Sequence, residues 1–240
     1  MKLTTVLFDL DGTLLPMDTD AFIKLYFGLM AKKMAPHGYE AKPLMGAIWA
    51  GIQAMVQNDR SVTNEEVFWA SFTGTFGQKA LDDKPVFEEF YRKEFQGVQA
   101  SCGFTPMSRQ VLDTCAALGL RVALATNPFF PAGATHSRIR WAGLQPEDFQ
   151  LVTTYENSGS CKPNLLYYQE VLERLGVRPE ECMMVGNDVA EDMIARKLGM
   201  RVFLLTPCLL NKHNEDIDQF PHGDFPELLR FIEDQAHTDC

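Results

Sequence analysis

The sequence lacks long hydrophobic runs, paired-cysteine motifs and an excess of positive charge. No stretch of the 240-residue chain has the roughly 20 consecutive apolar residues that a membrane-spanning helix needs. There are 22 Lys and Arg residues against 32 Asp and Glu, so the formal net charge is −10. This balance argues against nucleic acid or an anionic membrane as a partner. An acidic protein that handles a phosphate group needs a local positive site, such as a metal ion or a placed lysine.

Nucleotide-binding motifs are also missing. The chain has neither G-x-G-x-x-G nor a P-loop, so nothing in it supports a nucleotide cofactor. Its six cysteines form no C-x-x-C pair, and the apolar N-terminal run is too short for a signal peptide. We therefore expect reduced thiols in a cytoplasmic protein. Cys115 and Cys182 are expected in the core, whereas the charge of Lys162 beside Cys161 could lower that thiol's pKa.

What is present begins with a short apolar strand that ends in two carboxylates. Residues 4–9 read as a buried strand, and Asp9 and Asp11 are two positions apart. Extended backbone would therefore point both side chains to the same side. Gly12 allows a sharp turn whose N–H groups can bind an anion. Two neighbouring carboxylates repel each other, so the pair implies a cation or a shared proton. An acidic turn closing an edge strand is the simpler alternative.

Residues 16–98 have the apolar spacing of helices and no convincing strand. Four amphipathic faces recur along this stretch, each with apolar residues three or four positions apart. They are Phe22–Leu25–Tyr26–Leu29–Met30, Ile48–Ile52–Met55–Val56, Phe68–Phe72–Phe76 and Phe87–Phe90–Tyr91–Phe95. We predict a small helical bundle whose aromatic side chains mainly form its own core.

From about residue 99, helices alternate with short apolar strands. The strands are expected near 120–126, 150–154, 181–185 and 201–205, with helices between them and a last helix near 225–235. Such alternation predicts a parallel sheet with helices on both faces. The expected fold is therefore α/β: a Rossmann-like core of residues 1–15 and 99–240, with a helical domain of residues 16–98 inserted after the first strand.

Polar residues follow four of the predicted strands. They are Asp9 and Asp11 after the first, Thr126 and Asn127 after the second, Lys162 in the loop after the third, and Gly186-Asn187-Asp188 with Asp192 after the fourth. In open α/β sheets the ligand crevice lies at the carboxyl ends of the strands. A turn, a solvated lysine or a helix cap explains each cluster singly. Their joint placement at one sheet edge predicts a functional site.

These four clusters resemble, in order, the motifs of the haloacid dehalogenase (HAD) superfamily, on its phosphatase side. The matching residues are Asp9-x-Asp11-Gly12-Thr13, Thr126-Asn127, Lys162-Pro163, and Gly186-Asn187-Asp188 followed by Asp192. The fourth motif departs from the commoner Gly-Asp by its Gly-Asn-Asp order. The resemblance implies that residues 16–98 are a helical cap that closes over the site and sets specificity. It also implies a magnesium-dependent phosphatase acting on a small phosphorylated metabolite.

The resemblance assigns a role to each matching residue. Asp9 would be the nucleophile that forms an aspartyl-phosphate, and Asp11 the general acid and base. Mg²⁺ would be held by the Asp9 carboxylate, the Asp11 main-chain carbonyl and Asp188. Asp192, one helical turn further, could orient that shell. The remaining residues would bind the phosphoryl group: Thr126 through its side chain, Asn127 through its backbone N–H, and Lys162 through its charge.

Other activities stay open at this point. Asp11 argues against a dehalogenase, because dehalogenase members lack the second aspartate. A phosphomutase, a phosphonate hydrolase with a cap lysine, and a non-catalytic phosphate-binding or scaffold protein are the alternatives. We expect His136, Arg138 and Arg140 to be solvated at the surface or to pack against a neighbouring element. We expect the cap residues Lys24, Lys32 and Lys33 to lie on a solvated helix face. Phe129 and Phe130 could line the site or simply pack.

Overall fold

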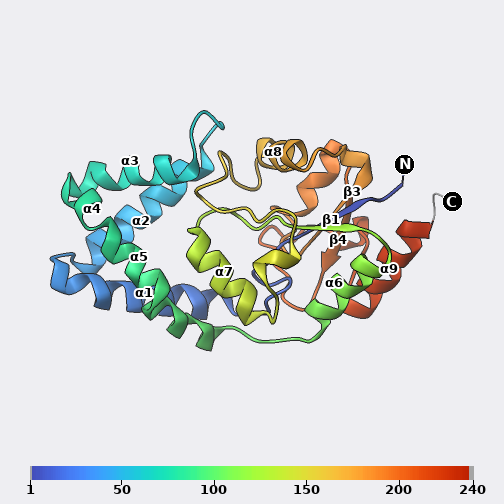
Figure 1. The fold of residues 1–240 in the computed structure, drawn as a ribbon, viewed down its shortest axis with the longest axis horizontal. Helices are drawn as coiled ribbons and strands as arrows, with labels where there is room; N and C mark the ends of the chain where they lie inside the picture. Colours follow the sequence, from blue (N-terminus) through green and yellow to red (C-terminus); the bar gives the residue numbers. More distant parts are fainter. Residues whose placement is uncertain (1, 238–240) are drawn as a thin grey trace.

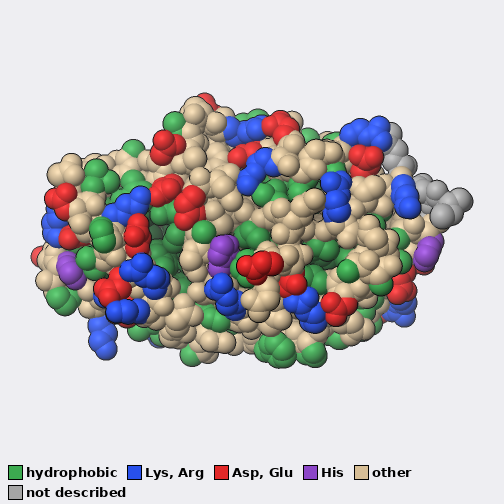
Figure 2. All heavy atoms as spheres, viewed as in Figure 1, with side chains coloured by type: hydrophobic (Ala, Val, Ile, Leu, Met, Phe, Trp, Pro, Cys, Tyr) green, Lys and Arg blue, Asp and Glu red, His purple; other side chains and the backbone are tan. Residues whose placement is uncertain are grey.

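The computed structural model describes residues 2–237. The chain forms two lobes, one built of helices alone and one built around a sheet (Figure 1). No helix among these residues is both long enough and apolar enough to cross a membrane. Basic and acidic side chains are interspersed over the face seen in Figure 2.

A five-stranded parallel sheet forms the centre of the second lobe, with strand order β2-β1-β3-β4-β5. The strands are β1 (Thr5–Phe8), β2 (Arg121–Leu124), β3 (Cys182–Gly186), β4 (Arg201–Leu205) and β5 (His222–Gly223). β1 lies inside the sheet, with Leu7 paired to Ala123 on one side and to Met184 on the other. All four of its residues are buried, as expected for a strand covered on both faces. The predicted α/β fold is confirmed.

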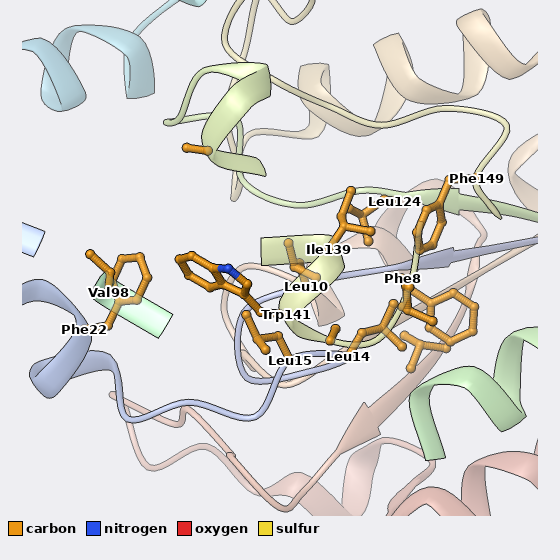
Figure 3. Packing of buried hydrophobic residues seen from close by; sticks show 14 of the residues in the cluster. Phe8, Leu10, Leu14, Leu15, Phe22, Val98, Leu124, Ile139, Trp141 and Phe149 are labelled. Carbon is orange, nitrogen blue, oxygen red and sulfur yellow. The ribbon is translucent and has the colours of Figure 1, made fainter. Parts of the chain in front are cut away.

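Side-chain alternation along β1 divides the core into two layers. Val6 and Phe8 pack with α6 (Met107–Ala117), α7 (Ala132–Trp141) and α9 (Phe225–His237). Leu7 points to the other face and packs with α8 (Leu165–Leu175) and the 3₁₀ segment η5 (Met193–Leu198). Phe8, Leu124 and Ile139 meet in the first layer, which extends through Trp141 toward Phe22 and Val98 of the helical lobe (Figure 3).

The helical lobe, here called the cap, consists of five α-helices and two 3₁₀ segments. These are α1 (Thr19–Met34), η1 (Ala35–His37), α2 (Ala41–Val56), α3 (Asn64–Phe76), α4 (Lys79–Asp82), α5 (Lys84–Arg92) and η2 (Glu94–Ser101). Two of these helices begin at a side-chain cap. The Asp18 side chain accepts a hydrogen bond from the Ala21 amide at the start of α1, and Thr63 and Glu66 form a capping box at the start of α3. The four predicted apolar faces fall on α1, α2, α3, and α5 with η2, whereas short α4 was not predicted.

Three other segments differ from the expectation. Residues 150–154 run along β2 but make a single bridge, Leu124 to Val152, because Asn157 takes the Thr154 amide and turns the chain away. The expected helix at 190–198 is a turn followed by 3₁₀ segment η5, with the Asp192 side chain folded back onto the Asp188 amide. The two-residue strand β5 was too short for its pattern to predict.

Backbone hydrogen bonds join the cap and the sheet lobe in two places, and α5 and η2 of the cap also pack against α7. The chain leaves and re-enters the sheet lobe side by side, where Met17 bridges Cys102 and the Gly103 amide donates to the Pro16 carbonyl at 2.7 Å. At the second place, residues 58–65, here called the docking loop, lie against residues 155–160. The amides of Arg60, Asn64 and Glu65 donate to carbonyls of Gly159, Ser158 and Tyr155, each at 2.8 Å.

Candidate active site

The two acids of the first motif lie where β1 ends. The Asp9 amide donates to the Val185 carbonyl at 2.9 Å, so the strand geometry continues one residue past Phe8. The chain then turns at Gly12, whose φ of +84° is unfavourable for residues with a Cβ atom. A Cβ there would also overlap the Asn187 side chain. The glycine therefore permits both the turn and the close approach of the first and fourth motifs.

Lys162 forms the electrostatic centre of the site. Its Nζ lies 2.9 Å from Asp9 Oδ1 and 2.6 Å from Asp192 Oδ1, and its side chain is only 1% exposed. Burial disfavours its charge, but Asp192 and Asp9 hold the Lys162 pKa well above its usual value. Thr13 Oγ1 donates to the other Asp9 oxygen at 3.2 Å. Contacts to both of its carboxylate oxygens thus fix Asp9 in position.

Asp192 connects the fourth motif to Lys162 through its two carboxylate oxygens. Its Oδ2 accepts from the Asp188 amide at 3.0 Å, while its Oδ1 binds Lys162. A Cβ at position 186 would overlap the Asp192 carboxyl, which explains the glycine there. Burial raises the pKa of Asp192 and Lys162 opposes the shift. Asp188 Oδ1 accepts from the amides of Ala190 and Glu191 at 2.8 and 3.0 Å, so its carboxyl is held at the start of the following turn.

Arg138 is a site residue that the sequence analysis missed. Its side chain is 1% exposed, and its guanidinium forms an ion pair with the Asp11 carboxylate and lies 4.5 Å from the Phe130 ring centroid. Burial raises the pKa of Asp11, with Arg138 opposing the shift. The sequence did carry a signal, because Arg138 lies four residues after Ala134 and three before Trp141, on the buried face of α7.

The second motif lies beside these acids. Thr126 is 2% exposed, and its carbonyl accepts from Thr153 Oγ1 at 2.7 Å and from the Tyr167 hydroxyl at 2.9 Å. Asn127 Nδ2 donates to Glu191 Oε2 at 2.9 Å. Glu191, which the sequence analysis also left out, therefore ties the second motif to the fourth.

A cavity of about 250 Å³ lies between this polar edge and the cap. Six of the seven predicted site residues line it: Asp9, Asp11, Thr126, Asn127, Asp188 and Asp192. The seventh, Lys162, contacts the cavity's Asp9 and Asp192. Phe129 and Phe130 also line the cavity, and the ring centroid of Phe130 lies 5.5 Å from that of Tyr26. The two expectations for this pair, lining the site and packing, are therefore both met. The structure thus brings the four motifs together, while their chemical roles remain predictions.

Two weaker candidates lie elsewhere. Lys24, Lys32 and Lys33 do not line the cavity, and Lys33 pairs with Glu89 and Glu94 within the cap. Cys161 is fully buried beside Asn64, and burial raises the pKa of its thiol, so the lowering that Lys162 could have caused is not found. Cys115 and Cys182 are buried as predicted, and Cys240 lies outside the described residues.

The donor set at the cavity fits a hard cation. Among residues 2–237, no group of three His, Cys, Asp or Glu side chains is arranged to hold a metal by itself. The predicted set needs only two carboxylates, Asp9 and Asp188, together with the Asp11 main-chain carbonyl. All three donors are oxygens, which Mg²⁺ prefers. In addition, Asp11 Oδ1 is buried without a hydrogen-bond partner in the described structure, so this edge holds an unsatisfied oxygen acceptor.

Comparison with known proteins agrees with this geometry. The family model for haloacid dehalogenase-like hydrolases matches residues 3–199. The haloacid dehalogenase-like hydrolase domain-containing protein 3 of Xenopus laevis is 29% identical over 163 residues, which span 65% of each chain. The phosphoglycolate phosphatase of Nitrosospira multiformis is 24% identical over 92% of this chain and 88% of its own.

Solved structures share the fold. A HAD phosphatase from Thermococcus onnurineus superposes with a TM-score of 0.60 at 19% identity, covering 96% of this chain and 98% of its own. A 2-haloacid dehalogenase from Pseudomonas syringae pv. Tomato gives a TM-score of 0.65 at 17% identity, with the same coverage. With the family model matched over most of its length and the four motifs gathered at one sheet edge, the chain belongs to the haloacid dehalogenase-like hydrolases.

Proposed function

We propose that the protein is a magnesium-dependent phosphatase that hydrolyses a small phosphomonoester through an aspartyl-phosphate. The observation that carries this proposal is the Asp9 carboxylate, which lines the cavity while Lys162 Nζ holds one of its oxygens at 2.9 Å. The second aspartate of the first motif, Asp11, supports a phosphatase over a dehalogenase. Curated relatives named as phosphatases point the same way.

The proposed reaction divides between the two aspartates. Asp9 attacks phosphorus in line with the ester oxygen, and the P–O bond to the leaving group breaks as the Asp9–phosphorus bond forms. Asp11 gives its proton to the departing oxygen, a role favoured by the burial that raises its pKa. Asp11 then takes a proton from water, which attacks the aspartyl-phosphate and releases inorganic phosphate.

The surrounding residues bind and orient. Lys162 and the Thr126 side chain offset and hold the charge on the phosphoryl oxygens, and Asp192 fixes Lys162 in place. Mg²⁺, held by Asp9, Asp188 and the Asp11 carbonyl, would supply positive charge against the developing negative charge. Arg138 positions the Asp11 carboxyl.

The Asp9→Asn substitution tests the nucleophile. An amide of the same shape cannot attack phosphorus, so we expect no phosphate release from phenyl phosphate in the presence of Mg²⁺. The fold should persist, because Lys162 keeps its contact with Asp192. Colorimetric phosphate detection and circular dichroism measure the two outcomes. Turnover by this variant at the wild-type rate would refute the assignment. Loss of wild-type turnover with EDTA and its recovery with Mg²⁺ would support the metal.

The alternatives have less support. A phosphonate hydrolase needs a cap lysine, but among residues 2–237 no lysine of the cap lines the cavity. Borohydride trapping with a phosphonate substrate should accordingly leave the chain unlabelled. A phosphomutase would yield an isomerised sugar phosphate in place of free phosphate. A non-catalytic binder would retain phosphate analogues yet hydrolyse no ester.

A further inference from the structure

We propose that the leaving group of the substrate is small, uncharged and apolar, and that the cap binds it through aromatic and aliphatic side chains. This inference rests on the proposed phosphatase function and narrows its substrate class. It follows from the wall of the cavity that faces the acids.

The cap's contribution to the cavity carries no charge. Among the described residues, the cap side chains that line it are Thr19 and six apolar or aromatic ones: Phe22, Ile23, Tyr26, Phe27, Trp49 and Ile52. The polar atom of Tyr26 is already used, because its hydroxyl lies 2.9 Å from that of Tyr91. This wall therefore offers ring faces and methyl groups to a ligand, with the Thr19 hydroxyl as its one side-chain polar group.

Trp49 gives independent support. It lines the cavity, yet 44% of it is exposed, which makes it one of the few large hydrophobic residues left in water. Its ring lies 5.7 Å from that of Phe27, so the two present a continuous aromatic surface. An exposed apolar surface at the edge of a cavity is typical of a ligand-binding groove.

Charge on the opposite wall disfavours a second anionic group. Five carboxylates line that wall: Asp9, Asp11, Asp188, Glu191 and Asp192. The buried cations Lys162 and Arg138 are already paired with three of them. Within residues 2–237, this leaves Asp188 and Glu191 without a cationic side-chain partner and no buried cation for a second anionic group. The one lysine among the described lining residues, Lys212, is exposed on a loop of the sheet lobe, where water and salt screen its charge. A leaving group bearing a carboxylate or another phosphate would face repulsion there and find no cation in the cap.

The size of the cavity limits the leaving group further. Its volume of about 250 Å³ must hold the phosphoryl group as well. This lies below the roughly 300–1,000 Å³ of pockets that take drug-sized ligands. A single ring or a short branched chain therefore fits better than a nucleoside.

Non-hydrolysable phosphonates test the inference without turnover. We would measure, by calorimetry with the full chain and Mg²⁺, the affinities for phenylphosphonate, 4-carboxyphenylphosphonate and phosphonoacetate. We expect phenylphosphonate to bind at least tenfold more tightly than either carboxylated compound. Trp49→Ala should weaken phenylphosphonate binding about tenfold and leave inorganic phosphate binding unchanged. Leu81→Ala is the matched control, because Leu81 is a similarly exposed cap residue that does not line the cavity.

The outcomes separate the two proposals. Equal or tighter binding of the carboxylated compounds, no measurable phenylphosphonate binding, or equal losses for phenylphosphonate and inorganic phosphate in Trp49→Ala would each overturn the apolar subsite. If phenylphosphonate is preferred but no phosphate ester is hydrolysed, the phosphatase proposal fails while the subsite stands. If esters are hydrolysed and phosphoglycolate is preferred to phenyl phosphate, the subsite fails while the phosphatase proposal stands.

Discussion

Arg138 places a guanidinium in the protein interior, where a lone charge would be costly. Its partner Asp11 and the ring of Phe130 compensate for that burial. The same contact fixes the carboxyl group that we propose as the general acid. One arginine thus links the packing of α7 to the chemistry at the end of β1.

Removing the Arg138 charge should destabilise the protein. Arg138→Met keeps most of the side-chain volume but leaves Asp11 without its cation, and breaking a buried pair costs about 3 kcal/mol. We expect the free energy of unfolding, measured with urea, to fall by about this amount. Arg140→Met is the control, because Arg140 is exposed on the same helix. Equal stability losses in the two variants would contradict the argument.

The pair of Arg109 and Asp148 makes stability depend on pH. Hydrogen bonds from Arg109 lower the pKa of Asp148, although partial burial opposes them. Because the folded pKa lies below the unfolded value of about 3.9, this contribution is present above that value and disappears as the pH falls through the folded pKa.

Asp148→Asn should therefore lower the free energy of unfolding near neutral pH but not at acidic pH. We expect a loss of about 0.5–1 kcal/mol at pH 7, typical of a partly exposed ion pair. Urea unfolding of both proteins should show this difference shrinking as the pH is lowered toward 2. Asp113→Asn serves as the control, since Asp113 is 66% exposed and 3.7 Å from Arg109. A difference that stays constant with pH would rule out the ionic origin.

Residue patterns predicted the members of the site better than their partners. The carboxyl ends of parallel strands share one edge, so the positions of Asp9, Thr126 and Asp188 followed from strand periodicity alone. Arg138 and Glu191 lie on segments whose inward face depends on how each one packs. Their contacts could not be predicted before that packing was known.

Among the secondary-structure elements, long periodic segments were predictable and short ones were not. The apolar residues of α1, α2 and α3 recur over several helical turns. The apolar run at 201–205 predicted the bounds of β4. In contrast, β5 has two residues, and η5 follows a turn in which the side chains of Asp188 and Asp192 accept hydrogen bonds from backbone amides. Tertiary contacts determine the structure of such short segments, and the periodicity of the sequence does not predict those contacts.

Two glycines of α2 should respond in opposite ways to alanine. Gly46 is exposed, and a Cβ there would meet nothing within 4 Å, so Gly46→Ala should stabilise the protein by about 0.5–1 kcal/mol. Gly51 is buried, and its Cβ would lie 2.5 Å from the Phe68 ring on α3. Gly51→Ala should instead destabilise by about 1–3 kcal/mol. Thermal unfolding of both variants checks the pair, and the same sign of change in both would contradict it.

For the molecule as a whole, the docking loop holds the cap against the sheet lobe. Its three backbone hydrogen bonds are joined by an ion pair between Arg60 and Glu173, at 2.5 Å between Nη2 and Oε2. The cavity lies between the two lobes, so we expect the strength of this docking to affect how readily the cap moves away from the site.

Arg60→Ala should loosen the docking without unfolding either lobe. Loss of a partly exposed ion pair costs about 0.4–1 kcal/mol, equivalent to a roughly two- to fivefold faster local opening. Hydrogen exchange of the Asn64 and Glu65 amides should accelerate by that factor, while exchange in β1 stays the same. Arg178→Ala, which removes an exposed pair with Glu181 inside the sheet lobe, should leave both regions unchanged. Unaltered exchange at Asn64 in Arg60→Ala would show that the pair does not hold the loop.

The adjacent exit and return of the chain, at Pro16 and Gly103, have a consequence for how such a protein can diversify. Because both ends of the insertion meet at one hydrogen-bonded junction, a foreign helical module with a different lining could be spliced in there without displacing any residue of the sheet edge. Under the proposed function, ligand preference and bond-breaking chemistry would be separately exchangeable parts, and we expect a chimera built at this junction to inherit the selectivity of its donor.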